Sequence, residues 1–201
     1  MQAMKDKITV DLLIQTLKSK GYAVFENGDC NLNLVGVRKD MNISDKFDDL
    51  MCVFYKVDGK WRINKWSITT DPGLSGAKKP TNSKGVAILK PGQYRGAWVI
   101  GKHKGQYTAL VQNKPLVVYR DDNRDAIIDY VEEDGGIFGI NIHRSNPNGS
   151  SMIVGNWSLG CQVFQNSKDF ERFMELVQTS AKLYSPRFTY TLIEAADLKL
   201  K

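Results

Sequence analysis

The chain has 201 residues, 42% of them hydrophobic and 25% charged, which fits one ordinary globular domain and excludes a disordered or fibrous protein. Lysine and arginine number 28 against 22 aspartates and glutamates. The resulting net charge of +6 favours polyanionic partners such as acidic wall polymers, anionic lipid or nucleic acid, without choosing among them. No apolar run reaches the roughly 18 residues of a membrane-spanning helix, so we expect no membrane insertion.

The N-terminal segment and the cysteines bear on where the protein works. Residues 1–22 contain no apolar stretch followed by a small-residue cleavage site, so we predict synthesis in the cytoplasm without a signal peptide. Three cysteines (Cys30, Cys52 and Cys161) at unequal spacing argue against a disulfide framework and a four-cysteine zinc site. The basic residues are scattered and form no recognition motif, so a nucleic acid partner is not expected.

The first half of the chain has one helical segment followed by strand patterning. Leucines at helical spacing predict a short helix over residues 10–20, which Gly21 ends. A hairpin is predicted between residues 51–57 and 60–68. The two residues between them, Asp58 and Gly59, suit the positive φ angles of a type I′ turn.

A second hairpin is predicted between residues 96–100 and 107–111. Its loop, residues 101–105, has glycine at both ends and lysine on both sides of His103. We therefore expect His103 to be an exposed loop residue.

Two turn-rich segments, residues 71–84 and 145–151, interrupt the strands, and loops of this size usually shape a site or are mobile. Asn166 is a good N-cap for a helix that ends near Leu183, and residues 187–193 alternate as a final strand. We find no linker or repeat, and predict a single domain over residues 1–201. In it, an N-terminal helix and extension (1–30) precede a β-rich core from about residue 31 onward.

A histidine and a cysteine stand on either side of the second turn-rich segment. Residues 136–143 are predicted to form a strand whose alternation puts Asn141 and His143 on one face. Cys161 follows Gly160 where the loop returns to regular structure. Nucleophilic cysteine needs a base, a group that orients the base, and N–H groups facing the oxyanion. The pattern favours a catalytic pair, and the alternative is a buried structural cysteine with a strand histidine.

The motif His143, 14 residues, then Ser-Leu-Gly-Cys (158–161) resembles the signature of the L,D-transpeptidase catalytic domain family. The stretch 90–94, Lys-Pro-Gly-Gln-Tyr, is similar to that family's Thr-Pro-x-Gly-x-Phe/Tyr strand. Residues 66–164 more broadly resemble a little-characterised group of phage-encoded proteins, which we interpret as diverged, lysin-like relatives. The resemblance implies a mainly β, β-rich α+β fold: a β-sandwich or barrel with one N-terminal and one C-terminal helix.

The same resemblance implies acyl transfer on peptidoglycan stem peptides, with no cofactor required. Cys161 would attack a peptide carbonyl to form a thioester, and His143 would be the general base. The amides of Gly160 and Cys161 would bind the oxyanion. Asn141 or the main chain at Arg144 would orient His143.

The expected substrate contacts lie beside the motif or in the strand that matches the family. They are Trp157, Ser158, Arg144 and Tyr94. Trp157 has an equal alternative as a core residue, and Ser158 as a hydrogen-bonding turn residue. The chain departs from the family where Leu159 replaces a histidine and Gln162 an arginine. These departures leave the family's substrate and transferase activity open.

Oxygen-bearing side chains follow the strand-like residues 116–119 at the spacing of an EF-hand loop. The predicted ligands of a structural Ca²⁺ are Asp121, Asn123, Asp125, Asp129 and Glu132. Ala126 stands where such a loop has glycine, so the alternative is an acidic surface turn.

Three functions remain. The first is a cysteine-dependent, endolysin-like peptidoglycan hydrolase that acts at the cell wall or periplasm after a separate protein permeabilises the membrane. The second is an L,D-transpeptidase that forms cross-links. The third is a non-enzymatic wall-binding or virion structural protein on a decayed catalytic fold, which Leu159 favours.

Overall fold

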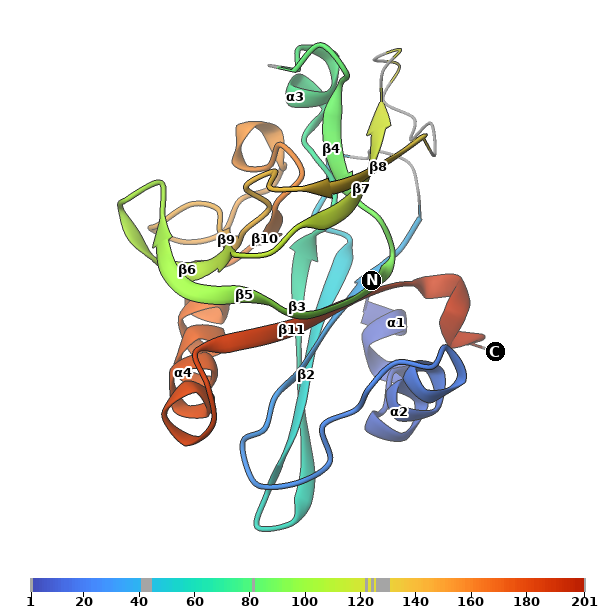
Figure 1. The fold of residues 1–201 in the computed structure, drawn as a ribbon, viewed down its shortest axis with the longest axis vertical. Coiled ribbons are helices and arrows are strands. Elements are labelled where there is room, and N and C mark those ends of the chain that lie inside the picture. The colour runs from blue at the N-terminus through green and yellow to red at the C-terminus, as the bar shows by residue number, and fades with distance from the viewer. Residues whose placement is uncertain are drawn as a thin grey trace.

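The computed structural model describes residues 2–40, 45–80, 82–121, 123, 125 and 131–200, with the backbone alone for 131–134. Strands hold 39% of the residues and helices 25%, which confirms the predicted mainly β class. Eight strands close into a barrel in the order β1-β11-β5-β6-β9-β10-β3-β2, and a three-stranded sheet lies beside it (Figure 1). The barrel strands are β1 (Asn33–Arg38), β2 (Asp49–Val57), β3 (Lys60–Thr69), β5 (Gly92–His103), β6 (Tyr107–Gln112), β9 (Ile142–Arg144), β10 (Gln162–Phe164) and β11 (Arg187–Glu194).

The smaller sheet has the order β4-β7-β8 and consists of β4 (Val86–Leu89), β7 (Leu116–Asp121) and β8 (Val131–Gly136). Next to it, the turn-rich segment 71–84 contains the short helix α3 (Leu74–Lys78), which lies beside the 3₁₀ helix η1 (Gly155–Trp157). The N–H of Gly73 donates to Ser158 O at 2.9 Å, which fastens this segment to the residues before Cys161. Segment 71–84 therefore lies beside the residues that precede Cys161.

The β2–β3 hairpin forms where the sequence predicts it. Asp58 and Gly59 have φ of +51° and +70°, the positive pair that a type I′ turn requires. The β5–β6 hairpin is longer than predicted, because β5 continues to His103 and leaves only residues 104–106 in the loop.

The barrel interior is filled by large apolar side chains from strands on opposite sides. Trp98, Phe164 and Tyr190 are among the largest fully buried side chains, and the Trp98 and Tyr190 rings meet edge to face at 5.3 Å between centroids. Burial of this much aromatic surface supplies the main driving force for closing the barrel.

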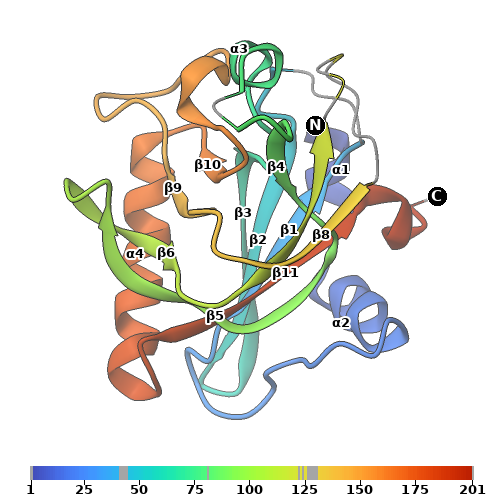
Figure 2. The ribbon, with the colours of Figure 1, turned by 45° about the horizontal axis from the view of Figure 1, so that its top comes forward.

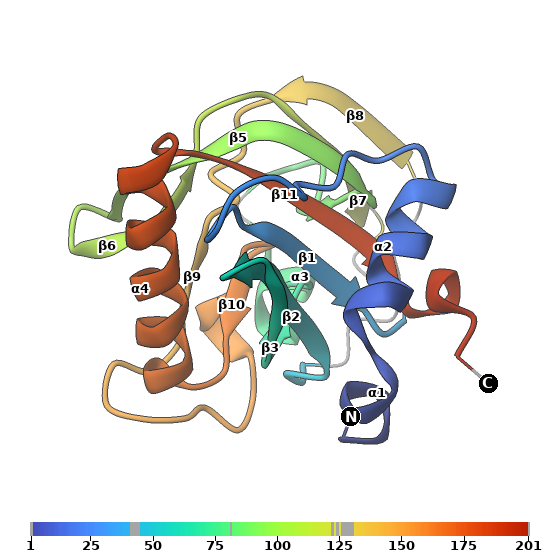
Figure 3. The ribbon, with the colours of Figure 1, turned by 90° about the horizontal axis from the view of Figure 1, so that it is seen from below.

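Helices cover the barrel on two sides (Figure 3). The predicted N-terminal helix is α2 (Val10–Ser19), which begins at the Thr9 cap and packs its leucines against β1 and β2. A second helix, α1 (Gln2–Lys7), packs on the same side and was not predicted from the sequence. α4 (Ser167–Leu183) begins as predicted, with Asn166 Oδ1 accepting from the amides of Lys168 and Asp169. It buries Phe170 and Phe173 against the barrel near β9 and β10 (Figure 2). A final 3₁₀ helix, η2 (Ala195–Leu198), follows β11.

The predicted strand over residues 136–143 is wrong in its middle. β8 ends at Gly136 and β9 begins at Ile142, and Gly139 has φ +73°, which breaks the extended backbone. The Gln112 side chain supplies hydrogen bonds that a neighbouring strand would otherwise make, because its Oε1 accepts from the amides of Phe138 and Ile140 at 3.0 and 3.1 Å. In the part of the chain that the structure describes, no helix is long and apolar enough to span a membrane.

Replacing Gln112 with leucine is expected to lower the free energy of unfolding by about 2 kcal/mol, because two partly buried amides lose their acceptor. The measurement is urea unfolding followed by tryptophan fluorescence. Gln106→Leu is the matched control, since Gln106 is exposed, and its effect should stay within about 0.5 kcal/mol. Equal unfolding energies for the two variants would contradict the bridging role of Gln112.

Candidate functional site

His143 lies on β9, and Cys161 directly precedes β10, the parallel strand beside it. β9 and β10 pair with His143 opposite Val163 and Ile142 opposite Gln162. Ile142 and Phe164 point into the barrel, so His143, Val163 and Cys161 share its outer face. Cys161 lies two residues before Val163, which puts its Cα roughly 8 Å from that of His143 by strand spacing.

Backbone groups hold the Cys161 thiol in place. The Asn141 N–H donates to Cys161 Sγ at 3.4 Å, and the thiol donates to Gly139 O at 3.4 Å. The side chain is half-buried and packs beside Val154 and Val163. Because the backbone around Gly139 is irregular, the Gly139 carbonyl can accept from the thiol. In a regular strand, this carbonyl would pair with a neighbouring strand.

The main chain at Arg144 orients the His143 ring. His143 Nδ1 lies 2.8 Å from Arg144 O, and because a carbonyl oxygen only accepts, Nδ1 carries the proton. Nε2 is then the basic nitrogen. Tyr107 braces the arrangement, since its hydroxyl is 3.2 Å from both His143 Nδ1 and Arg144 O. The sequence left two groups open as the one that orients His143: Asn141 and the main chain at Arg144. In the structure, the Arg144 carbonyl is the group that contacts the His143 ring.

His103 is part of this site, and the prediction that it is an exposed loop residue is wrong. Its side chain is 6% exposed and its ring stacks on His143 at 3.9 Å between centroids, with 21° between the planes. Asn141 Nδ2 donates to His103 Nδ1 at 3.1 Å, while Asn141 Oδ1 accepts from Gln112 N at 3.0 Å. Asn141 therefore orients His103 and not His143.

The electrostatics of the site favour uncharged forms. Burial, helped by the neighbouring His103, lowers the pKa of His143 to about 3, and burial also lowers the pKa of His103. Burial raises the pKa of the Cys161 thiol, against the opposing effects of the Asn141 amide and Lys104. Burial chiefly raises the pKa of Tyr107, and Cys161 adds to that shift, so the two side chains lie in one electrostatic neighbourhood. At neutral pH the resting pair is a thiol and a neutral imidazole.

The turn before Cys161 is tightly built. Gly160 has φ +117°, and a Cβ there would lie 1.9 Å from Ala87 O, so the position requires glycine. The Ser158 hydroxyl accepts from Gly160 N at 3.1 Å and donates to Cys161 O at 2.9 Å. The Gly160 amide is thus engaged within the turn and is not presented to a substrate oxygen. Among the described residues, no acceptor lies within hydrogen-bond distance of the Cys161 amide.

Two of the expected substrate contacts have other roles. Ser158 is fully buried and closes the turn, which corrects its assignment as a substrate contact and agrees with the alternative. The Tyr94 hydroxyl lies 2.6 Å from Lys90 O and 3.1 Å from Val117 O, and its ring packs edge to face on Trp98. Tyr94 therefore fastens the start of β5 to β7 and also is not a substrate contact.

Two hollows flank the Cys161 segment. One, of about 260 Å³, is lined by His103, His143, Arg144 and Trp157. Trp157 is 43% exposed at its rim, whereas the Arg144 guanidinium packs on the Tyr107 ring, 4.1 Å from its centre. The other, of about 300 Å³, has Arg120, Phe138 and Leu159 in its wall.

Leu159, where the resembling family has histidine, has a packing role. Its side chain is half exposed and lies against Gly76 of α3, where a Cβ would come within 2.2 Å of Leu159 Cδ2. The other two cysteines lie elsewhere: Cys52 is fully buried, and burial raises its pKa to about 12, while Cys30 lies before β1.

The predicted calcium ligands lie only partly within the described residues. Asp121 is buried at the end of β7, and Asn123 Oδ1 accepts from the Asp125 amide at 2.9 Å. Asp129 and the Glu132 side chain lie outside the described residues. Within the described parts of the chain, no three Asp, Glu, His or Cys side chains form a metal-binding group. Calcium binding stays a prediction.

No protein-family model, curated protein or solved structure matches this chain.

His143 is expected to titrate with its pKa lowered to about 3, because burial and the stacked His103 both disfavour its charged form. The depressed pKa also means that stability is lost as pH falls from about 6.5 toward 3, since the unfolded chain binds the proton first. The measurement is an NMR titration of the two imidazoles. His103→Ala should raise the His143 midpoint toward its ordinary value, and a wild-type midpoint near 6.5 would contradict the arrangement.

Proposed function

We propose that this protein is a cysteine-dependent peptidoglycan hydrolase that cleaves amide bonds of stem peptides or their cross-links. The observation that carries the proposal is the His143 ring, held by the Arg144 carbonyl through Nδ1, on the strand parallel to the one that Cys161 precedes. The resemblance of the 143–161 motif to the signature of the L,D-transpeptidase family supports the substrate class. The net charge of +6 suits an acidic wall surface.

The reaction proceeds in two acyl transfers. His143 Nε2 takes the thiol proton as Cys161 Sγ attacks the peptide carbonyl, and the developing oxyanion is met by the Cys161 amide. His143 then gives that proton to the leaving amine, which departs and leaves a thioester on Cys161. A water molecule, deprotonated by His143, attacks the thioester, releases the new carboxylic acid and restores the thiol.

The neutral resting pair is consistent with this sequence. A neutral imidazole is a base that can accept the thiol proton at once, whereas an imidazolium would have to lose a proton first. Because burial disfavours the separated charges, the thiol is expected to lose its proton only as its sulfur attacks a bound substrate. Trp157 and Arg144 line the adjacent hollow and are placed to contact such a substrate.

A non-catalytic wall-binding protein is the second candidate, and one observation favours it. The Gly160 amide is engaged by Ser158, so the oxyanion position has one fewer donor than the resembling family implies. On this account Cys161 and His143 are structural, and the hollows beside them bind peptidoglycan without cleaving it.

Incubating purified peptidoglycan with the wild type, Cys161→Ala and His143→Ala, and weighing the fragments by mass spectrometry, tests the proposal. We expect the wild type to release free amine and carboxyl termini. Cys161→Ala should lower the rate by at least about a thousandfold and His143→Ala by at least about a hundredfold. Cys30→Ala, which alters a second half-buried cysteine, is the matched control and should keep the activity.

The product distribution separates the alternatives. If new cross-linked dimers form and their formation depends on Cys161, the activity is transpeptidation and not hydrolysis. If all four proteins pellet with peptidoglycan and give identical fragment patterns, the catalytic function is overturned and the non-catalytic binding function remains. Repeating the reaction with a calcium chelator tests the predicted metal, whose loss would lower activity if it supports the site.

A further inference from the structure

A hollow of about 450 Å³ lies apart from the Cys161 site and shares no lining residue with the two hollows beside it. It forms where four segments meet: the connection between α2 and β1, the bulged part of β5, the turn after β6, and the end of α4 with the start of β11. Its volume is in the range that proteins use for small ligands.

All charged side chains that line this hollow are positive. Arg95, Lys114 and Arg187 line it, and none of its lining residues is aspartate or glutamate. The acidic side chains of the adjoining connection are engaged elsewhere: Glu26 pairs with Lys18 at 2.6 Å, and Asp29 accepts from the amides of Asp58 and Gly59. Three full positive charges outweigh the roughly half negative charge at the C-terminus of α4.

The backbone that carries these cations is irregular. The pairing of β5 with β11 shifts register between Phe188 and Tyr190, and Gly96 on β5 has φ +58°. A Cβ on Gly96 would lie 3.5 Å from Lys114 Nζ and 3.9 Å from Arg187 Cβ, so the glycine leaves space between the two basic residues. Bulges commonly re-aim side chains next to binding sites.

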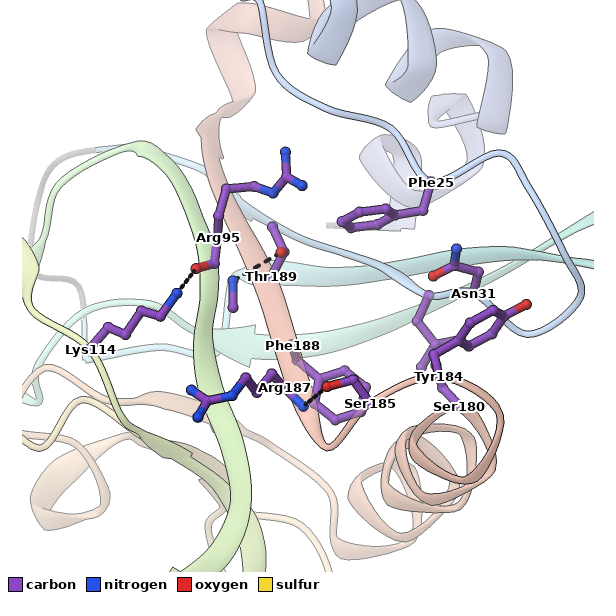
Figure 4. A pocket seen from close by; sticks show the side chains of 12 residues that line it. Phe25, Asn31, Arg95, Lys114, Ser180, Tyr184, Ser185, Arg187, Phe188 and Thr189 are labelled. Carbon is purple, nitrogen blue, oxygen red and sulfur yellow. Dashed lines mark hydrogen bonds between the residues drawn. The ribbon is translucent and has the colours of Figure 1, made fainter.

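Aromatic rings form the opposite side of the hollow. Figure 4 shows Phe25 and Tyr184 on one side of the hollow and Lys114 on the other, with the Arg95 guanidinium turned toward Phe25 and the Arg187 guanidinium pointing away from Tyr184. The Tyr184 hydroxyl is fixed by a 2.7 Å hydrogen bond to Asp29 O, and the Arg95 guanidinium lies 5.5 Å from the centre of the Phe25 ring. A flat group placed here would contact aromatic faces while an attached anion reached the cations.

We propose that this hollow binds a ligand that joins a phosphate to a flat aromatic ring, the chemistry of a mononucleotide. Two guanidinium groups and an ammonium fit the several oxygens and the multiple charge of a phosphate better than the single charge of a carboxylate. The rings supply stacking that is independent of the charge. This inference does not depend on the proposed hydrolase activity.

Isothermal titration with ADP in magnesium-free buffer tests the proposal, with inorganic phosphate and adenosine titrated separately. ADP should bind at least tenfold more tightly than either part, and more weakly at about 300 mM than at about 50 mM salt. Arg95→Gln and Arg187→Gln should each weaken ADP binding about tenfold. Arg172→Gln, which removes an arginine that is 70% exposed on α4, is the matched control and should change nothing.

Melting temperatures equal to that of the wild type would show that the variants are folded. Phosphate binding as tightly as ADP would overturn the role of the aromatic rings. Equal ADP affinity for the wild type and both arginine variants, an equal loss in Arg172→Gln, or no ADP binding would overturn the site. The readout is binding alone, so its failure is distinguishable from failure of the hydrolase proposal.

Discussion

The parallel pairing of β9 with β10 is the constraint on which the rest of the site depends. A parallel pair cannot be joined by a tight turn, so the chain must leave the barrel and return in the same direction. Residues 145–161 make that crossover, which explains why His143 and Cys161 are far apart in sequence although one lies on β9 and the other directly precedes β10. The same crossover folds over the outer face of the barrel and buries the imidazole beneath it.

Burial in turn sets the chemistry. The stacked rings of His103 and His143 exclude water from each other, and neither gains an acidic partner among the contacts of the site. Charge on either ring is therefore unfavourable, and the proton positions follow from hydrogen bonds to Arg144 O and Asn141 Nδ2. The barrel thus presents a neutral imidazole with a fixed tautomer, and its lowered pKa makes it a weaker base than a free histidine.

Helices and turns that depend on neighbouring residues could be predicted from the sequence. Contacts that depend on which distant strands lie side by side could not. The helices near residues 10–20 and 167–183 and the Asp58–Gly59 turn depend on caps, spacing and positive φ, which the sequence displays directly. His103 was misplaced because its burial depends on β6 lying next to β9, which is a contact between distant segments. The alternation of residues 136–143 likewise concealed the break at Gly139.

The central claim is that Cys161 becomes acylated with His143 as its base. Intact-protein and peptide mass spectrometry after brief acid quenching of a reaction with soluble stem peptide measures this directly. The account predicts an added acyl mass on the Cys161 peptide, removed by hydroxylamine and lost in the His143→Ala variant. No added mass, or the same mass on Cys30 or in the variant without the imidazole, would contradict it.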